Sequence, residues 1–254
     1  MASTRDGERF ANHLKDLAER SYQNNLYTFT NFLDEAQISQ LRSMERELSY
    51  AGLTLFGGSE HADRCVARFG REDALGYDQP FPILCLCIAP SMEKYGEVLS
   101  HRDYLGALMS LGVERDLIGD IYVAEKTAYV FCLEHIADYI KENLTTVRHT
   151  DVRVSILEHA PETAGPVLEK RMIIVASERL DAVISQVFGL SRSRSLSLFP
   201  QGKVFVNGRQ ISNNSITCHP SDKISVRGYG KFIYDGLEGT TGKGRLRILL
   251  RVYK

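Results

Sequence analysis

The chain has 254 residues, of which 43% are hydrophobic and 25% are charged, and both fractions are average for globular proteins. This composition excludes a disordered or fibrous chain, and the length predicts two or three small domains. The net charge of −1 conceals an uneven distribution: residues 171–254 hold 14 basic and 5 acidic side chains, whereas residues 1–170 hold 17 and 27. An excess of nine positive charges at one end predicts a polyanionic partner there.

No apolar run approaches the roughly 20 residues that span a bilayer, and residues 1–10 are polar rather than signal-like, so we expect a cytoplasmic protein. The cysteines are odd in number and scattered, which is not the pattern of a disulfide framework. We expect reduced thiols at all five positions: Cys65, Cys85, Cys87, Cys132 and Cys218. No second Cys or His pair stands at zinc spacing beside Cys85 and Cys87, so we expect no metal. We expect no cofactor either, because no cofactor-binding Gly-rich loop is found.

Residues 1–78 are expected to form a helical N-terminal domain. Apolar residues recur at helical spacing in two stretches, Phe10 to Leu17 and Ile38 to Met44. Asp34 followed by Gln37 is the pattern of a capping box for the second helix. A third short helix is expected after Ser59. On one face it would carry three arginines, which are typical of a solvated helix surface: Arg64, Arg68 and Arg71.

Residues 79–160 are expected to form a central domain with the element order βαββαβ, which is the ferredoxin-like arrangement shared with RNA-recognition (RRM-like) domains. The expected elements are strands 83–89, 118–124, 127–133 and 151–157 and helices 100–111 and 134–144. Tyr129 and Phe131 lie where RNA-recognition domains stack bases. The first strand has no aromatic residue, however, so we interpret both rings as core aromatics. Residues 161–172 are rich in Pro and Gly and are expected to be a linker.

Residues 173–254 are expected to place two helices over a small sheet. Ser177 would cap a helix with an apolar stripe from Leu180 to Val187, and Ser191 would cap the next. Arg192 and Arg194 fall in the first turn of that second helix, where the helix dipole opposes cations. A phosphate bound nearby would remove the conflict.

The remainder of this domain is expected to be strands. Asn207-Gly208 predicts a tight hairpin, because both residues tolerate positive φ. Residues 222–227 alternate as a strand, with Ile224 and Val226 inward. The tail, residues 243–254, alternates as a final strand whose outer side is basic. Those arginines either protect an edge strand or contact RNA.

The C-terminal motifs resemble the S-four RNA-binding (alpha-L) domain in their order and spacing over about 55 residues. They are Glu178-Arg179-Leu180-Asp181, Ser191-Arg192-Ser193-Arg194, Gly202-Lys203-Val204-Phe205-Val206-Asn207-Gly208 and the strand from Asp222 to Arg227. The resemblance implies that the two-helix face docks on structured RNA. The sequence thus predicts an α+β chain that ends in an S-four-type domain.

Nearly the whole chain resembles the YlmH family of bacterial proteins. The motifs that carry this resemblance are Phe56-Gly57-Gly58, His101-Arg102-Asp103-Tyr104-Leu105-Gly106-Ala107-Leu108, Gly112 and Ile118-Gly119-Asp120-Ile121. It implies a monomeric, non-enzymatic factor of ribosome-associated quality control. Such a factor binds rRNA of the large ribosomal subunit and peptidyl-tRNA, acts with other quality-control factors and supports alanine tailing of stalled chains. An RNA-modifying enzyme and a cell-division adaptor are the alternatives.

We assign no catalytic residue. His101-Arg102-Asp103 is similar to a kinase catalytic loop, but no Gly-rich phosphate loop accompanies it. A catalytic dyad at Cys218-His219 is unsupported, because adjacent side chains in a loop diverge. The expected RNA-binding residues are Arg179, Arg192, Ser193, Arg194, Lys203, Arg227, Lys231, Arg245 and Arg247. Candidates for a second RNA contact are Arg64, Arg68, Arg102 and Arg115.

Overall fold

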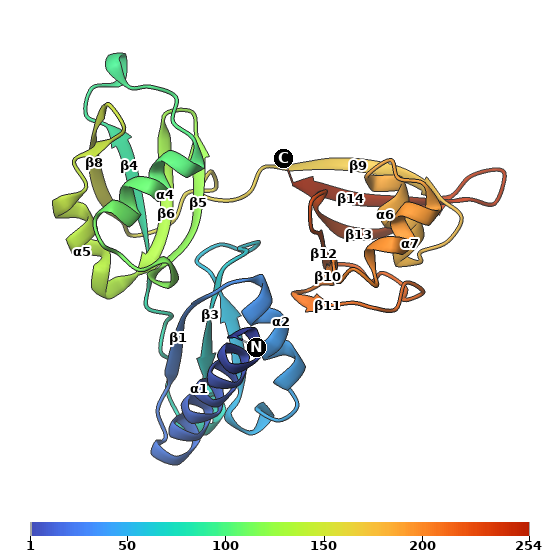
Figure 1. Ribbon diagram of the computed structural model, residues 1–254, viewed down its shortest axis with the longest axis horizontal. Helices are drawn as coiled ribbons and strands as arrows, with labels where there is room; N and C mark the ends of the chain where they lie inside the picture. Colours follow the sequence, from blue (N-terminus) through green and yellow to red (C-terminus); the bar gives the residue numbers. More distant parts are fainter. Residues whose placement is uncertain (1, 254) are drawn as a thin grey trace. The chain divides into compact units, whose positions relative to one another are not determined.

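In the computed structural model, which describes residues 2–253, the chain divides into two units at Pro166 and Val167 (Figure 1). Helix and strand both contribute substantially to each unit, as expected for an α+β chain. Within the described residues, no helix is long and apolar enough to cross a membrane.

The first unit begins with a mixed α+β region rather than the helical domain expected from the sequence. Its elements are α1 (Ala2–Asn24), β1 (Thr28–Leu33), α2 (Glu35–Met44), β2 (Leu53–Phe56), β3 (Cys65–Phe69) and α3 (Glu72–Leu75). The strands form an antiparallel sheet in the order β1-β3-β2. Apolar side chains of α1 and α2, among them Leu14 and Leu41, pack against buried Phe69 of that sheet.

The third helix expected after Ser59 is wrong, because β3 occupies that place. Arg64 precedes the strand, Arg68 lies within it and Arg71 follows it, so these residues do not share a helix face. The arginine spacing suggested a helical period, but buried Val66 and Phe69 anchor the segment in the sheet. The capping box is confirmed: Asp34 Oδ1 accepts a hydrogen bond from Gln37 N, and Gln37 Oε1 accepts one from Asp34 N, both at 2.9 Å.

The remainder of the first unit has the expected ferredoxin-like order. Its elements are β4 (Ile83–Pro90), α4 (His101–Ser110), β5 (Ile118–Ala124), β6 (Thr127–Leu133), α5 (Glu134–Asn143), β7 (Thr146–Val147) and β8 (Thr150–Leu157). The sheet runs β5-β6-β4-β8-β7, which places the first and third main strands side by side in the centre. Both helices contribute to one core with the same face of this sheet, including Tyr104, Ile140 and Val130 (Figure 1).

The other face of the central sheet is partly covered by the N-terminal region. Phe32 of β1 and Val66 of β3 are buried in one cluster with Cys85 and Phe131 of the central sheet. Phe131 is 2% exposed, so its interpretation as a core aromatic is confirmed. Part of the surface on which RNA-recognition domains stack bases is therefore occupied by the chain itself.

The second unit places two helices on a six-stranded antiparallel sheet. Its elements are β9 (Leu168–Val175), α6 (Leu180–Val187), α7 (Arg192–Leu198), β10 (Val204–Val206), β11 (Arg209–Gln210), β12 (Asp222–Val226), β13 (Gly230–Thr240) and β14 (Leu246–Tyr253). The strand order is β11-β10-β12-β13-β14-β9. Side chains from both helices, such as Ile184 and Leu198, share a core with Ile224, Phe232 and Ile248 of the sheet.

Three details of the second unit differ from the sequence expectations. The linker expected at 161–172 overlaps β9, which begins at Leu168 and pairs with β14 over eight residues. That pairing also makes β14 an internal strand, so its arginines do not protect an edge. The N-cap of α6 is Arg179 rather than Ser177, because the chain turns into the helix two residues later than expected.

Two other details are confirmed. Ser191 caps α7, since its Oγ accepts a hydrogen bond from Arg194 N at 3.3 Å. The hairpin at Asn207-Gly208 has positive φ at both residues, 50° and 77°, and it joins β10 to β11.

Candidate nucleic-acid interface

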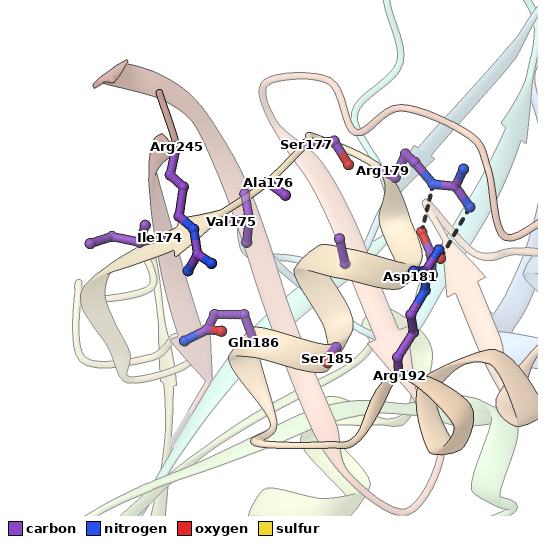
Figure 2. Close-up of a pocket in the computed structure, with 11 residues that line it drawn as sticks. Ile174, Val175, Ala176, Ser177, Arg179, Asp181, Ser185, Gln186, Arg192 and Arg245 are labelled. Atoms are coloured by element: carbon purple, nitrogen blue, oxygen red, sulfur yellow. Dashed lines mark hydrogen bonds and ion pairs between the residues drawn. The ribbon is translucent and has the colours of Figure 1, made fainter. Parts of the chain in front are cut away.

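A hollow of about 330 Å³ lies where β9 leads into α6 (Figure 2). Three arginines from separate elements line it: Arg179 precedes α6, Arg192 begins α7 and Arg245 lies in the hairpin between β13 and β14. The hollow is completed by Ile174, Val175, Ala176, Ser177, Asp181, Ala182, Ser185 and Gln186. The fold therefore brings together three of the expected RNA-binding residues. We call this site the arginine hollow.

The guanidinium of Arg179 is held by the carboxylate of Asp181 in the first turn of α6. Nε lies 3.0 Å from Oδ1, and Nη2 lies 3.1 Å from Oδ2 (Figure 2). Burial pushes the pKa of Asp181 upward, but the hydrogen bonds and charge of Arg179 outweigh it, so the pKa lies below its usual value. Asp181 is 4% exposed, whereas the Arg179 side chain is 40% exposed, so a buried anion orients a cation at the surface.

The first turn of α7 presents exposed Arg192, Ser193 and Arg194. Arg194 donates from Nε to the hydroxyl of Tyr229 at 3.0 Å, which directs it toward β13 rather than into the hollow. Ser193 lies beside the capping residue, with the two hydroxyl oxygens 3.1 Å apart. Of these three side chains, Arg192 lines the arginine hollow.

The other expected RNA-binding residues of this unit lie outside the hollow. Lys203 precedes β10, and its carbonyl accepts a hydrogen bond from Arg227 N at 2.9 Å. The guanidinium of Arg227 stands over the ring of Phe205, 4.5 Å from its centroid. Lys231 lies opposite Ser225, and Arg247 lies opposite Ile174. The expected RNA-binding residues therefore do not all line one surface, as the sequence suggested. An RNA contact at Lys203, Arg227, Lys231 and Arg247 stays a prediction.

Two candidates for the second RNA contact are turned toward the protein. Arg64 donates from Nε to the carbonyl of Ile118 at 3.0 Å and from Nη2 to that of Phe32 at 3.0 Å. Arg115 donates from Nη1 to the same Ile118 carbonyl at 2.5 Å. Burial lowers the pKa of both guanidinium groups. These contacts join the N-terminal region to β5 of the central sheet.

The remaining two candidates lie apart from this cluster. Arg68 forms an ion pair with Asp78 at 2.7 Å and stands 4.8 Å and 5.0 Å from the ring centroids of Tyr27 and Phe81. Its side chain is 15% exposed. Arg102 is exposed in the first turn of α4, where Asp103 completes a capping box with Ser100. Asp103 Oδ1 also forms an ion pair with Nη1 of Arg148 at 3.5 Å, so this carboxylate contacts the segment before β8 as well as the start of its own helix.

Asp120 has a role that the sequence did not reveal. Its Oδ2 accepts hydrogen bonds from the backbone of Asp63 at 2.6 Å and from the hydroxyl of Tyr122 at 3.1 Å. Burial raises the pKa of this carboxyl group. The Gly119-Asp120 motif therefore fastens the loop before β3 to the central sheet. The signal available in the sequence was an acidic residue within an otherwise apolar strand.

The thiols show no arrangement for chemistry. None of the five cysteines, all of which the structure describes, forms a disulfide, and burial raises the pKa of Cys85, Cys132 and Cys218 to about 12. Cys218 is 4% exposed while the neighbouring His219 is exposed, so the two side chains diverge. Between residues 2 and 253, no group of three or more His, Cys, Asp or Glu side chains is placed to hold a metal ion.

Comparison with known proteins identifies relatives of this chain. A family model described as "Putative RNA-binding domain in YlmH" matches residues 85–160, which span the central sheet from β4 to β8. The ribosome-associated protein quality control protein P2 of Bacillus subtilis (strain 168) is 28% identical over 235 residues, covering 92% of this chain and 89% of that protein. A solved structure, cell division protein ylmH from Streptococcus pneumoniae, aligns with a TM-score of 0.46 at 21% identity, covering 60% of this chain and 91% of that one.

Proposed function

This chain belongs to the YlmH family, and from that premise we propose that it is a ribosome-associated factor that holds structured RNA at the arginine hollow of its C-terminal unit. The observation that carries the site is the convergence of Arg179, Arg192 and Arg245 from three separate elements on one hollow. Guanidinium groups match phosphate oxygens with planar, forked donors, and their charge attracts the RNA backbone.

Asp181 supports this role by preorganising Arg179. A long side chain loses conformational entropy when it binds, and part of that loss is already incurred in the folded protein. The contact with Asp181 engages Nε and Nη2 of Arg179. We propose that Ser193, Arg194 and Lys203 extend the contact with the RNA along the start of α7 and β10.

The relatives support a proposal for the biological setting. We propose that the chain acts in the cytoplasm as a monomer in ribosome-associated quality control, since the relative from Bacillus subtilis bears that function in its name and aligns over most of both chains. The proposed partners are rRNA of the large ribosomal subunit, peptidyl-tRNA and other quality-control factors, and the proposed outcome is alanine tailing of stalled chains. We propose that the chain binds RNA without catalysing a reaction on it.

Sedimentation with large ribosomal subunits tests the site. Arg192→Glu combined with Arg194→Glu should reduce co-sedimentation at least tenfold, because two exposed cations become anions, while thermal unfolding stays near that of the wild type. Arg20→Glu with Lys141→Glu is the matched control, since it makes the same charge change at exposed positions of the first unit. Full retention of the Arg192 and Arg194 variant on the subunits contradicts the site.

Two further measurements test the proposed binding to peptidyl-tRNA on large subunits and the proposal that the chain does not modify RNA. Binding should be stronger to large subunits that carry peptidyl-tRNA than to empty ones, and equal binding contradicts the proposed tRNA contact. Nucleoside analysis of RNA incubated with the purified protein should show no new modification. A modified nucleoside would instead establish an enzyme.

A further inference from the structure

The arginine hollow runs along one face of α6. Four of its lining residues belong to that helix or to its N-cap: Arg179, Ala182, Ser185 and Gln186. Arg179 and Gln186 are seven residues apart, so at 1.5 Å of rise per residue they lie about 10 Å apart along the helix. A hollow of this length and of about 330 Å³ has room for more than one phosphate group, and its volume is at the lower end of those that hold organic ligands.

The hollow is cationic at both ends. Figure 2 shows Arg179 and Arg192 at one end, where Asp181 also lies. Arg245 lies at the other end, in the same part of the view as Gln186. The ionisable lining residues are thus three arginines and one aspartate, which leave two net positive charges. Each phosphodiester of a nucleic acid carries one negative charge, so the charge of the hollow matches two phosphates.

Neutral polar side chains in the hollow are available to a ligand. Within residues 2–253, neither the amide of Gln186 nor the hydroxyl of Ser177 makes a hydrogen bond. Ser185 differs, because its Oγ donates to the carbonyl of Leu190 at 2.6 Å. Gln186 is exposed and Ser177 is half-buried, and each side chain can both donate and accept a hydrogen bond. The methyl group of Ala182, one turn into α6, leaves space between the two cationic ends.

A ribonucleotide within an RNA strand presents the same pattern, with a phosphate on either side of a ribose and a 2′-hydroxyl that both donates and accepts. We infer that the arginine hollow takes one ribonucleotide with its two flanking phosphates, and that Gln186, with Ser177, recognises the 2′-hydroxyl. A single terminal phosphate would match the charge but would reach only one end. DNA has the same phosphates, so Gln186 becomes the residue that distinguishes ribose from deoxyribose. This inference rests on the proposed function of the arginine hollow.

The experiment uses the full chain and a minimal probe, adenosine 3′,5′-bisphosphate, which is one ribonucleoside with both phosphates. Its affinity is measured by NMR titration beside those of 2′-deoxyadenosine 3′,5′-bisphosphate and adenosine 5′-monophosphate. The wild type should bind the bisphosphate about tenfold more tightly than the monophosphate, which lacks one charge-assisted contact. It should bind the deoxy analogue, which has the same charge, about fivefold more weakly because one neutral hydrogen bond is lost. Arg192→Glu should abolish binding of all three, which locates the probe in the hollow.

Two variants separate the ribose contact from the second phosphate contact. Gln186→Leu should bind the ribose and deoxyribose bisphosphates equally. Gln186→Ala should do the same, and it cannot fill the hollow with a larger apolar side chain. Gln201→Leu is the matched control and should keep the fivefold difference, because Gln201 is exposed in the same unit and does not line the hollow. Arg245→Gln should bind the bisphosphate and the monophosphate equally, since it removes the cation at one end.

The outcomes distinguish this inference from the proposed function. Equal affinity of the wild type for the ribose and deoxyribose probes refutes recognition of the 2′-hydroxyl, and so does a ribose preference that survives in both Gln186 variants. Equal affinity for the monophosphate and the bisphosphate refutes the two-phosphate arrangement. Failure of the bisphosphate to bind at millimolar concentration overturns the whole inference, while sedimentation with large subunits that depends on Arg192 would leave the proposed function intact. A wild type that does not sediment with those subunits contradicts the function itself.

Discussion

The ring of Phe131 lies so close to Gly58 that a Cβ atom built on Gly58 would come within 2.1 Å of Phe131 Cδ1. A similar approach occurs at Gly119, where a Cβ atom would lie 2.6 Å from the ring of Phe32. Two of the glycine motifs that mark the family resemblance therefore have a packing role. They let the N-terminal region lie directly on the central sheet, beside the carboxylate of Asp120 and the guanidinium of Arg64.

Gly58→Ala should destabilise the first unit strongly. The new methyl group overpacks against Phe131, which costs about 1–3 kcal/mol, and the backbone at φ +94° adds about 1–2 kcal/mol. Gly112→Ala is the matched control, because Gly112 has φ +80° and nothing within 4 Å of its added Cβ. Denaturant unfolding should show a clearly larger loss of unfolding free energy for Gly58→Ala than for Gly112→Ala. Equal losses in the two variants would mean that the Phe131 ring moves away from the added methyl group at no energetic cost.

Asp181→Asn should lower the stability of the C-terminal unit by about 1–2 kcal/mol near neutral pH, as expected for a charged hydrogen bond with one exposed partner. The folded pKa of Asp181 is depressed, so the stabilisation is present above the unfolded pKa of about 3.9 and is lost as pH falls through the folded value. Unfolding curves of both proteins should converge as the pH drops below about 4. A constant difference at every pH would show that the charge of Asp181 contributes nothing.

Three of the five thiols should resist modification in the folded protein. Cys85, Cys132 and Cys218 are buried with a pKa of about 12, so only about one molecule in ten thousand carries the reactive thiolate at pH 8. An aromatic disulfide reagent should titrate at most the two partly exposed thiols, Cys65 and Cys87, before denaturation and all five after it. Rapid titration of more than two thiols in native buffer would contradict this packing.

Elements with a strong local signal were predictable from the sequence. The central βαββαβ order follows from apolar runs bounded by turn residues, and the hairpin at Asn207-Gly208 follows from the need for positive φ. The capping box at Asp34 was also evident, because it depends on two side chains three residues apart. The excess of basic over acidic side chains in residues 171–254 also predicted a basic C-terminal unit.

Features that depend on distant partners were not predictable. β3 and β9 form because remote strands pair with them, and neither alternates cleanly enough to be distinguished from a helix or a linker. The surroundings of charged side chains in the fold could not be predicted from the sequence either. Arg64 and Arg115 looked like free cations in the sequence, but the fold directs both to the carbonyl of Ile118. Likewise, nothing local to Lys231 or Arg247 indicates which face of the sheet presents it.

The pairing of β9 with β14 joins the beginning of the C-terminal unit to its end. During synthesis β9, Arg179 and Arg192 emerge first, but the partner strand and Arg245 emerge last. The arginine hollow therefore cannot assemble on a partly made chain, and a protein that stalls before Leu246 would display isolated basic segments without the site. Completion of the hollow, and of the RNA site proposed there, therefore waits until β14 has been made.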